Sequence, residues 1–315
     1  MNNKEKTCPV RNKKSTTSII SNGNNIIFFG TSEFAVGVLE QLKISDGISG
    51  GLASRYLPKL IITTPEKPSG RKLKLTPPPV KIWADENNIP TLQPEKLDEK
   101  FSDAIKNFSS NFSEWDLFIV AAYGKIIPQK ILDLPKHGTI NVHPSLLPKF
   151  RGATPIHNAI LEGEQETGVS IILLDEQMDH GPIIVQEKFT LWKNSISEIP
   201  PQSELEKQLA ILGGQMLTKI IPQWIAGKIT VQEQNHQQAT YTQKLKPNDS
   251  LIDLNNDPEL NFRKIQAFST WPKAHLFQSG KRIIIKKAHL NQGELIIDKV
   301  IPEGGKEINY SDLLK

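Results

Sequence analysis

The sequence predicts an α/β fold, in which a doubly wound parallel sheet forms a large N-terminal domain and a smaller domain follows. Three observations carry this prediction. From residue 25 onward, short apolar runs typical of buried strands alternate with helical stretches. The first of these runs leads directly into helix-capping residues. A Gln-rich stretch at 231–240 then separates this alternation from a segment of short strands. A chain of 315 residues is long enough for two such domains.

The helices and strands of the first domain are predicted from the spacing of apolar residues and from the capping and breaking residues between them. We expect strands at 25–30, 57–62, 88–92, 115–120, 138–143, 168–174 and 182–189, and helices at 34–42, 80–87, 98–108, 131–134, 153–162 and 205–225. The first strand ends at Gly30, and Thr31 offers a helix cap. Because that turn contains only one glycine, the dinucleotide fingerprint is absent and no NAD site is predicted.

Residues 1–24 form a basic tail, which we expect to be a disordered extension of a cytoplasmic protein rather than a targeting segment. The tail has no apolar core of signal-peptide length, and no run in the chain approaches a membrane span. Cys8 is the one cysteine, which excludes an internal disulfide or a Cys-ligated metal site. The tail has five basic side chains and one acidic side chain, which give a charge of +4, the same as that of the whole chain. The rest of the chain is therefore neutral on balance, and its net charge does not indicate binding of nucleic acid.

A Pro- and Gly-rich basic stretch follows the second expected strand, at residues 64–79. Its composition is typical of a solvated surface loop. The same cations would also suit an anionic partner, because Arg71 is a side chain that forks onto phosphate and stacks on bases. Both interpretations stand at this point.

The strand expected at 138–143 ends in a pattern of polar residues. Side chains alternate along a strand, so Asn141 and His143 point to the same side. In open α/β sheets ligands bind at the carboxyl ends of the strands. Asn can donate a hydrogen bond to a carbonyl oxygen, and His can move a proton near neutral pH. Acyl transfer needs both functions at once.

The complete, ordered set of motifs resembles the folate-dependent formyltransferases. It consists of His-Pro-Ser-Leu-Leu-Pro from His143, then Arg151-Gly152, Gly-Val-Ser from Gly168, and Met-Asp-His-Gly around Asp179. Within that family it is similar to the members that act on charged initiator tRNA. The resemblance implies transfer of a formyl group from 10-formyltetrahydrofolate to the α-amine of methionine carried by that tRNA.

The resemblance also implies roles for individual residues. Asn141 would donate to the oxygen that gains negative charge, His143 would pass a proton, and Asp179 would hold the imidazole or a relaying water. Read alone, Asp179 is a turn residue. The residues expected to bind folate are Ser145, Leu146, Leu147, Pro148, Tyr123 and Gly124. The residues expected to contact tRNA are Arg71, Lys72 and Lys74.

The family's domain organisation leads us to expect a Rossmann-like catalytic domain at 25–228, a linker at 229–246 and a small C-terminal domain at 247–315. In that domain we expect a helix at 260–268 and strands at 275–278, 282–287 and 295–300. The family's second domain is an open β-barrel of the oligonucleotide-binding (OB) type. Only six residues lie between Ala288 and Leu295, so the barrel should be a shortened one.

Other functions remain open from the sequence alone. The enzyme could formylate a small amine, such as an amino sugar nucleotide or glycinamide ribotide, although such an enzyme would need neither the basic insertion nor a second domain. A non-catalytic RNA-binding relative would have no need of Asn, His and Asp together. We expect a monomer, and no metal, because the His and acidic residues do not fall at metal-ligand spacing.

Overall fold

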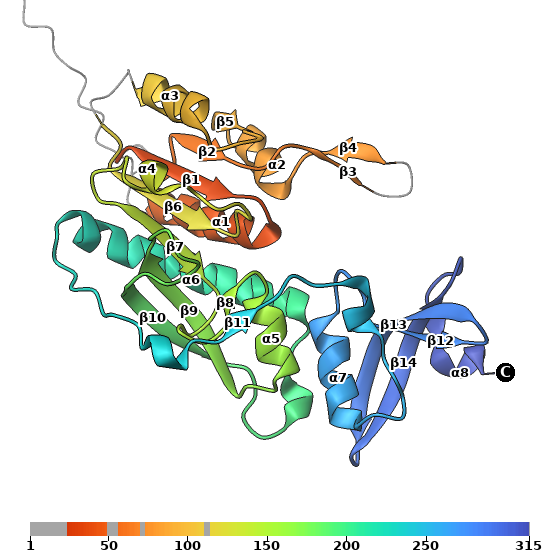
Figure 1. The fold of residues 1–315 in the computed structure, drawn as a ribbon. Helices are drawn as coiled ribbons and strands as arrows, with labels where there is room; N and C mark the ends of the chain where they lie inside the picture. Colours follow the sequence, from red (N-terminus) through yellow and green to blue (C-terminus); the bar gives the residue numbers. More distant parts are fainter. Residues whose placement is uncertain (1–23, 49–55, 70–72, 110–113, 315) are drawn as a thin grey trace, which may run out of the picture.

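The structure of this protein, a computed structural model, describes residues 24–48, 56–69, 73–109 and 114–314. Figure 1 shows a large α/β domain followed by a smaller domain of antiparallel strands. The tail expected at 1–24 lies outside the described residues, apart from its last position.

A seven-stranded sheet forms the centre of the large domain, in the order β10-β9-β7-β6-β1-β2-β5. These strands are β1 (Ile26–Gly30), β2 (Leu60–Ile62), β5 (Thr91–Leu92), β6 (Leu117–Ala121), β7 (Thr139–His143), β9 (Glu166–Leu173) and β10 (Ile183–Thr190). The first five are parallel, whereas β9 pairs antiparallel with β7 and β10 pairs antiparallel with β9. The predicted parallel sheet is confirmed, with two antiparallel connections at one edge.

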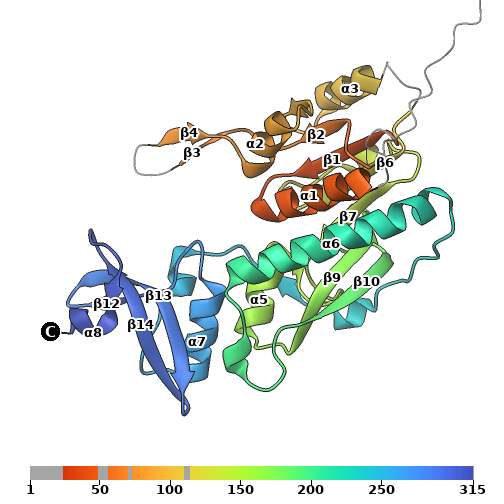
Figure 2. The same ribbon diagram turned by 180° about the vertical axis from the view of Figure 1, so that it is seen from behind.

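Helices cover both faces of this sheet (Figure 2). They are α1 (Glu33–Ile48), α2 (Pro79–Glu86), α3 (Glu99–Phe108), α4 (Gln129–Leu132), α5 (Pro155–Leu161) and α6 (Gln202–Ile225), with a short 3₁₀ turn, η2 (Ile196–Glu198), before α6. Residues of α1, α2, α5 and α6 share one buried cluster, and residues of α3 and α4 share another. The domain is therefore doubly wound, as predicted.

Strand side chains alternate between these two clusters. In β1, Phe28 belongs to the α1–α6 cluster and Phe29 to the α3–α4 cluster. In β7, Ile140 and Val142 both belong to the α1–α6 cluster. Because successive side chains point to opposite faces, Asn141 and His143 are directed to the other side of the sheet.

The basic stretch after β2 forms a hairpin, which corrects the expectation of an open loop. Strands β3 (Lys67–Ser69) and β4 (Lys74–Thr76) pair antiparallel, with Lys67 opposite Thr76. Figure 1 shows the hairpin projecting from the large domain toward the same end of the molecule as the C-terminal domain. Backbone pairing holds it, since all three residues of β4 are exposed.

The C-terminal domain is a four-stranded antiparallel sheet in the order β12-β13-β14-β15, with two helices against it. Its elements are α7 (Pro258–Ala267), β12 (His275–Gln278), β13 (Lys281–Asn291), β14 (Glu294–Pro302), β15 (Ile308–Asn309) and α8 (Tyr310–Leu313). A two-residue turn, Gln292-Gly293, joins β13 to β14, with both residues at positive φ. The short connection expected between these two strands is this tight hairpin.

The segment expected to be a linker packs along the large domain before it reaches the small one. It contains η3 (His236–Gln238) and β11 (Tyr241–Thr242), and η4 (Pro247–Ser250) follows it. Strand β11 pairs in parallel with β8 (Arg151–Gly152), and Gln232 forms a bridge with Ile183 at the start of β10. We call residues 231–242 the strap.

Side-chain hydrogen bonds also join the two domains. Arg263 of α7 donates to the carbonyl oxygen of Leu161 at 2.8 Å, and Gln266 donates to that of Ile199 at 2.9 Å. His157 of α5 lies beside Phe268 at this interface, with 6.1 Å between ring centroids.

Candidate active site

Asn141 and His143 lie on the same face at the carboxyl end of β7, as the alternation predicted. Both are nearly buried, with exposed fractions of 9 % and 4 %. The strand is fixed on both sides, by β6 and by β9, where Ser170 is the residue opposite His143. The two polar side chains therefore occupy a rigid, largely desolvated position.

Asp179 joins these two residues from the turn between β9 and β10. Its Oδ1 accepts a hydrogen bond from Nδ2 of Asn141 at 3.3 Å, and its Oδ2 lies 3.6 Å from Nδ1 of His143. The same Oδ2 accepts the backbone N–H of Gly152 at 2.7 Å. The structure thus brings together the three residues expected to be catalytic. The backbone of Asp179 is left-handed, at φ +50°.

The imidazole of His143 faces an oxygen atom at each ring nitrogen. Nε2 lies 2.9 Å from the carbonyl oxygen of Phe150, which can only accept, so Nε2 carries a hydrogen. Nδ1 faces the carboxylate of Asp179. A proton on Nδ1 therefore has a negative partner beside it, and the ring has a defined orientation in either state.

The loop Ser145–Pro148 is held by two residues of the neighbouring antiparallel strands. The hydroxyl of Ser170 donates to the carbonyl oxygen of Ser145 at 2.6 Å and accepts from the backbone N–H of Leu147 at 3.1 Å. Gln186 donates to the carbonyl oxygen of Leu147 at 3.0 Å and to the hydroxyl of Ser170 at 2.7 Å. The loop is a rigid wall beside the site.

The four loop residues expected to bind folate differ in accessibility. The side chains of Ser145 and Leu147 are buried, at 0 % and 3 % exposed, whereas Leu146 and Pro148 are partly exposed. The hydroxyl of Ser145 is used within the loop, because it donates to the carbonyl oxygen of Lys149 at 2.6 Å. Only the partly exposed pair offers side-chain surface to a ligand.

Tyr123 and Gly124 follow β6, at the same sheet edge as the end of β7, because these strands are parallel. The ring of Tyr123 is buried against Phe29, with centroids 5.5 Å apart, and burial raises the pKa of its hydroxyl. The expected part of Tyr123 in folate binding stays a prediction, and its buried ring offers little side-chain surface for it. Gly124 is exposed at φ +81°, with open space where a side chain would stand.

Of the three residues expected to contact tRNA, the structure describes one. Lys74 lies in β4 and is exposed, whereas Arg71 and Lys72 lie outside the described residues. Two apolar neighbours of Lys74 are also exposed, Leu73 at 71 % and Leu75 at 59 %. The described part of the hairpin is therefore both apolar and cationic.

The structure adds residues that sequence reasoning missed. Ser170 and Gln186 secure the loop, and the N–H of Gly152 holds the Asp179 carboxylate. Gln234 of the strap donates to the backbone around Asp179. Ser170 and Gly152 stood in the quoted motifs but had no assigned function. No motif in the sequence marks Gln234, because the Gln-rich composition around it is typical of a linker.

The described residues contain no group of three or more His, Cys, Asp or Glu side chains arranged to hold a metal ion. None of the helices within 24–48, 56–69, 73–109 and 114–314 is long and apolar enough to cross a membrane.

Comparison with known proteins gives matches over most of the chain. Residues 24–220 match the family described as formyl transferase, and residues 244–295 match the formyl transferase C-terminal domain. Methionyl-tRNA formyltransferase of Geobacillus sp. (strain WCH70) is 40 % identical over 256 residues, which is 81 % of this chain and 74 % of the relative. The Thermotoga neapolitana protein of the same name is 38 % identical over 259 residues, covering 82 % and 77 %.

Solved structures share the fold at lower identity. Methionyl-tRNA formyltransferase from Clostridium thermocellum gives a TM-score of 0.59 at 18 % identity, covering 91 % of this chain and 99 % of that one. An N-formyltransferase from Helicobacter canadensis, in complex with folinic acid and dTDP-3-aminofucose, gives 0.61 at 19 % identity, covering 91 % and 98 %.

The fold, the Asn–His–Asp site and both family matches define a formyl transferase. At about 40 % identity over most of both chains, this chain belongs to the methionyl-tRNA formyltransferase family.

Proposed function

We propose that this site transfers the formyl group of 10-formyltetrahydrofolate to the α-amino group of methionyl-initiator tRNA, with Asn141, His143 and Asp179 as its catalytic residues. The observation that carries the proposal is the convergence of these three side chains at the end of β7. The names of the relatives supply the tRNA substrate.

Asn141 provides a hydrogen bond for the oxygen that gains charge. Its amide nitrogen has two hydrogens, and the contact with Asp179 uses one of them. The other remains to donate to a carbonyl oxygen as the amine adds. In a nearly buried position this donor needs no reorganisation, and losing such a donor typically lowers the rate by about 10²–10³-fold.

His143 and Asp179 manage the proton. The attacking α-amine must be neutral, and a free α-amine titrates near pH ~7.7–8. Because Nδ1 of His143 faces the carboxylate, the imidazole can take up the proton that the amine loses as it bonds to the formyl carbon. It would then give that proton to the folate nitrogen as the bond between this nitrogen and the formyl carbon breaks. The ring does not turn while this happens, since its Nε2 is bonded to the carbonyl oxygen of Phe150.

The residues beside the trio fit a flat, partly apolar co-substrate. Leu146 and Pro148 offer apolar surface on a loop that Ser170 and Gln186 fix in place. Gly124 leaves open space at the end of the adjacent strand. In the proposal the folate, when bound, supplies the formyl group, and these residues orient it against Asn141.

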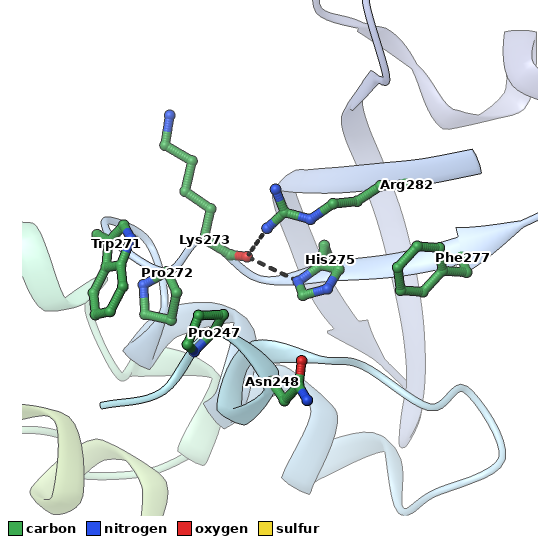
Figure 3. Close-up of a pocket in the computed structure, with 8 residues that line it drawn as sticks. All are labelled: Pro247, Asn248, Trp271, Pro272, Lys273, His275, Phe277 and Arg282. Carbon is green, nitrogen blue, oxygen red and sulfur yellow. Dashed lines mark hydrogen bonds between the residues drawn. The ribbon is translucent and has the colours of Figure 1, made fainter. Parts of the chain in front are cut away.

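The hairpin and a cavity of the C-terminal domain are the proposed tRNA contacts. Lys74 of β4, with Arg71 and Lys72 shortly before it in the sequence, would bind phosphates. Figure 3 shows the cavity, of about 410 Å³, between η4 and the start of β12. Trp271 and Phe277 flank it and are 62 % and 60 % exposed.

The lining of this cavity suits a nucleotide. Lys273 and Arg282 supply positive charge, and none of the eight lining residues is acidic. Exposed aromatic rings next to cations are the usual platform for unpaired bases and their phosphates. The proposal also places the enzyme in the cytoplasm, as a monomer.

A substrate panel tests the proposal. Purified protein and 10-formyltetrahydrofolate would be mixed with methionyl-initiator tRNA, and separately with free methionine, glycinamide ribotide and amino sugar nucleotides. We expect formylation of the charged tRNA alone. Transfer to a small amine instead would overturn the substrate and the tRNA contacts, while binding of tRNA without transfer would point to a non-catalytic relative.

A further inference from the structure

We propose that Gln234 of the strap is a positioning residue for Asp179, and that the buried Arg151 holds Gln234 in place. This inference rests on the proposed function, because it assigns Gln234 an effect on catalysis through Asp179. It makes the strap, which sequence composition marks as a linker, a part of the active site.

Gln234 bridges the turn that carries Asp179. Its side chain is nearly buried, at 5 % exposed. Its Nε2 donates to the carbonyl oxygen of Asp179 at 2.9 Å and to that of Gly181 at 2.7 Å. Both hydrogens of the amide are thereby used, one on each side of His180. The turn that sets the direction of the Asp179 carboxylate is clamped by one side chain.

Arg151 fixes the orientation of that amide. Its Nε and one terminal nitrogen donate to Oε1 of Gln234 at 3.2 and 2.6 Å. A guanidinium has no acceptor, so the oxygen of Gln234 must face Arg151 and the NH₂ group must face the two carbonyl oxygens. A flipped amide would set donor against donor and oxygen against oxygen. The guanidinium is itself buried, since Arg151 is 1 % exposed.

Strand β8, which contains Arg151, also holds the side-chain carboxylate of Asp179. Gly152, next to Arg151 in β8, donates its backbone N–H to Oδ2 of Asp179 at 2.7 Å. The carboxylate is thus fixed through Gly152 and the peptide backbone through Gln234. Strand β8 supplies the first contact directly and supports the second through Arg151, and it also pairs with β11 of the strap. Both the side chain and the backbone of Asp179 are therefore held by hydrogen bonds.

Asp179 needs such a frame because its backbone is unfavourable. A residue with a Cβ at φ +50° is strained and keeps that conformation only where its surroundings impose it. Without Gln234, two carbonyl oxygens lose their donor and the turn can relax. The carboxylate would then move away from Nδ1 of His143, now 3.6 Å distant.

The strap has other attachments, which separate this role from a general structural one. Gln232 pairs through its backbone with Ile183, and the N–H of Thr240 donates to the carbonyl oxygen of Pro148. These bonds do not involve the side chain of Gln234. Its loss should therefore leave the strap docked while the Asp179 turn loosens.

The test compares Gln234→Met, which keeps the length of the side chain and removes its hydrogen bonds, with Gln238→Met, a change of an exposed Gln in the same strap. In the full-length enzyme we expect Gln234→Met to lower kcat by about 10–100-fold, as loss of a residue that orients an active-site group typically does. KM for methionyl-tRNA and for folate should stay within about threefold, and Gln238→Met should match the wild type. Wild-type kcat in Gln234→Met, or a loss confined to KM, would overturn the proposal.

A double-variant cycle shows whether the effect passes through Asp179. In an Asp179→Asn background, Gln234→Met should cause little further loss of kcat, because the group that it positions is already gone. A full additional loss would overturn the proposal. If Asp179→Asn alone keeps wild-type kcat, the proposed function of Asp179 fails instead, so the two failures are distinguishable.

A second variant covers the case in which Gln234→Met does not fold. Gln234→Glu keeps an oxygen toward Arg151 but sets an acceptor against the carbonyl oxygens of Asp179 and Gly181. We expect a folded protein by circular dichroism, with kcat reduced and its pH profile altered as in Asp179→Asn. A folded Gln234→Glu with wild-type kcat and pH profile would overturn the proposal.

Discussion

Oδ2 of Asp179 lies 3.6 Å from Nδ1 of His143, although the first residue is in a turn and the second is at the end of a strand. This separation is too long for a hydrogen bond, but it leaves the carboxylate directly in front of the ring nitrogen.

Replacing His143 by Ala should lower kcat by about 10²–10⁴-fold, because the group that moves the proton is lost. Circular dichroism should show an intact fold. His289→Ala, which removes an exposed histidine of the C-terminal domain, is the control and should retain wild-type kcat. Turnover of His143→Ala at the wild-type rate would contradict the assignment.

Arg71→Ala should raise KM for methionyl-tRNA far more than KM for folate, because the hairpin is assigned to the nucleic acid and not to the co-substrate. Steady-state kinetics with each substrate varied in turn measures this split. Equal changes in both constants would argue against the hairpin as a tRNA contact.

Trp271→Ala should likewise weaken tRNA binding, by about 1–3 kcal/mol if one base stacks on the ring. The indole is 62 % exposed, so its removal leaves the core intact. Filter binding of the charged tRNA gives the affinity, and Leu254→Ala, which truncates an exposed apolar residue of the same domain, serves as the control. If the affinity of Trp271→Ala for tRNA is unchanged, the proposal that this cavity contacts tRNA is wrong.

His157 should make stability depend on pH. Burial lowers the pKa of its imidazole from 6.5 to about 4, and its Nε2 has no hydrogen-bond partner among the described residues. The unfolded chain therefore binds the proton first. The contribution of neutral His157 is complete above pH 6.5 and is lost as pH falls from 6.5 toward 4. The full loss is about 3 kcal/mol.

Urea unfolding at several pH values between 7.5 and 4 measures this dependence. His157→Gln should flatten it, whereas His289→Gln should follow the wild type. Since His157 lies beside Phe268 where α5 meets α7, acidification should first loosen the contact between the domains. A steep pH dependence that persists in His157→Gln would show that other groups cause it.

Gly214→Ala should destabilise the large domain. An added Cβ would lie 2.4 Å from Cβ of Gln41 and 3.0 Å from the carbonyl oxygen of Val38, in the backbone of α1. Overpacking costs about 1–3 kcal/mol, which exceeds the gain of about 1 kcal/mol in helix propensity. The free energy of unfolding should therefore fall, while Lys207→Ala, at an exposed position of α6, should change it little.

The sequence predicted the parts of the molecule that depend on local periodicity. The end of β7 is an example, because strand alternation alone places Asn141 and His143 on one face. Local patterns did not predict that Asp179 meets them, since that contact joins a turn to the end of a strand far away in the sequence. Its place in the site came from the family resemblance, and the structure brings the three side chains together.

Two placements could not be read from composition. The stretch around Gln234 is polar and Gln-rich, which is typical of a linker, yet its partners Arg151 and Gly181 are distant in the chain. Tyr123 follows a buried strand at the expected ligand edge, but its ring turns into the core beside Phe29. In both cases tertiary packing decides which side chains face the site.

The strap lies on the stretch of chain that connects the large domain to the C-terminal domain. The chain leaves Gln234 beside the Asp179 turn, passes through β11 and arrives at Pro247, on the wall of the C-terminal cavity. In the proposed function, a tRNA bound at that cavity would contact the same stretch of chain whose other end holds the catalytic turn.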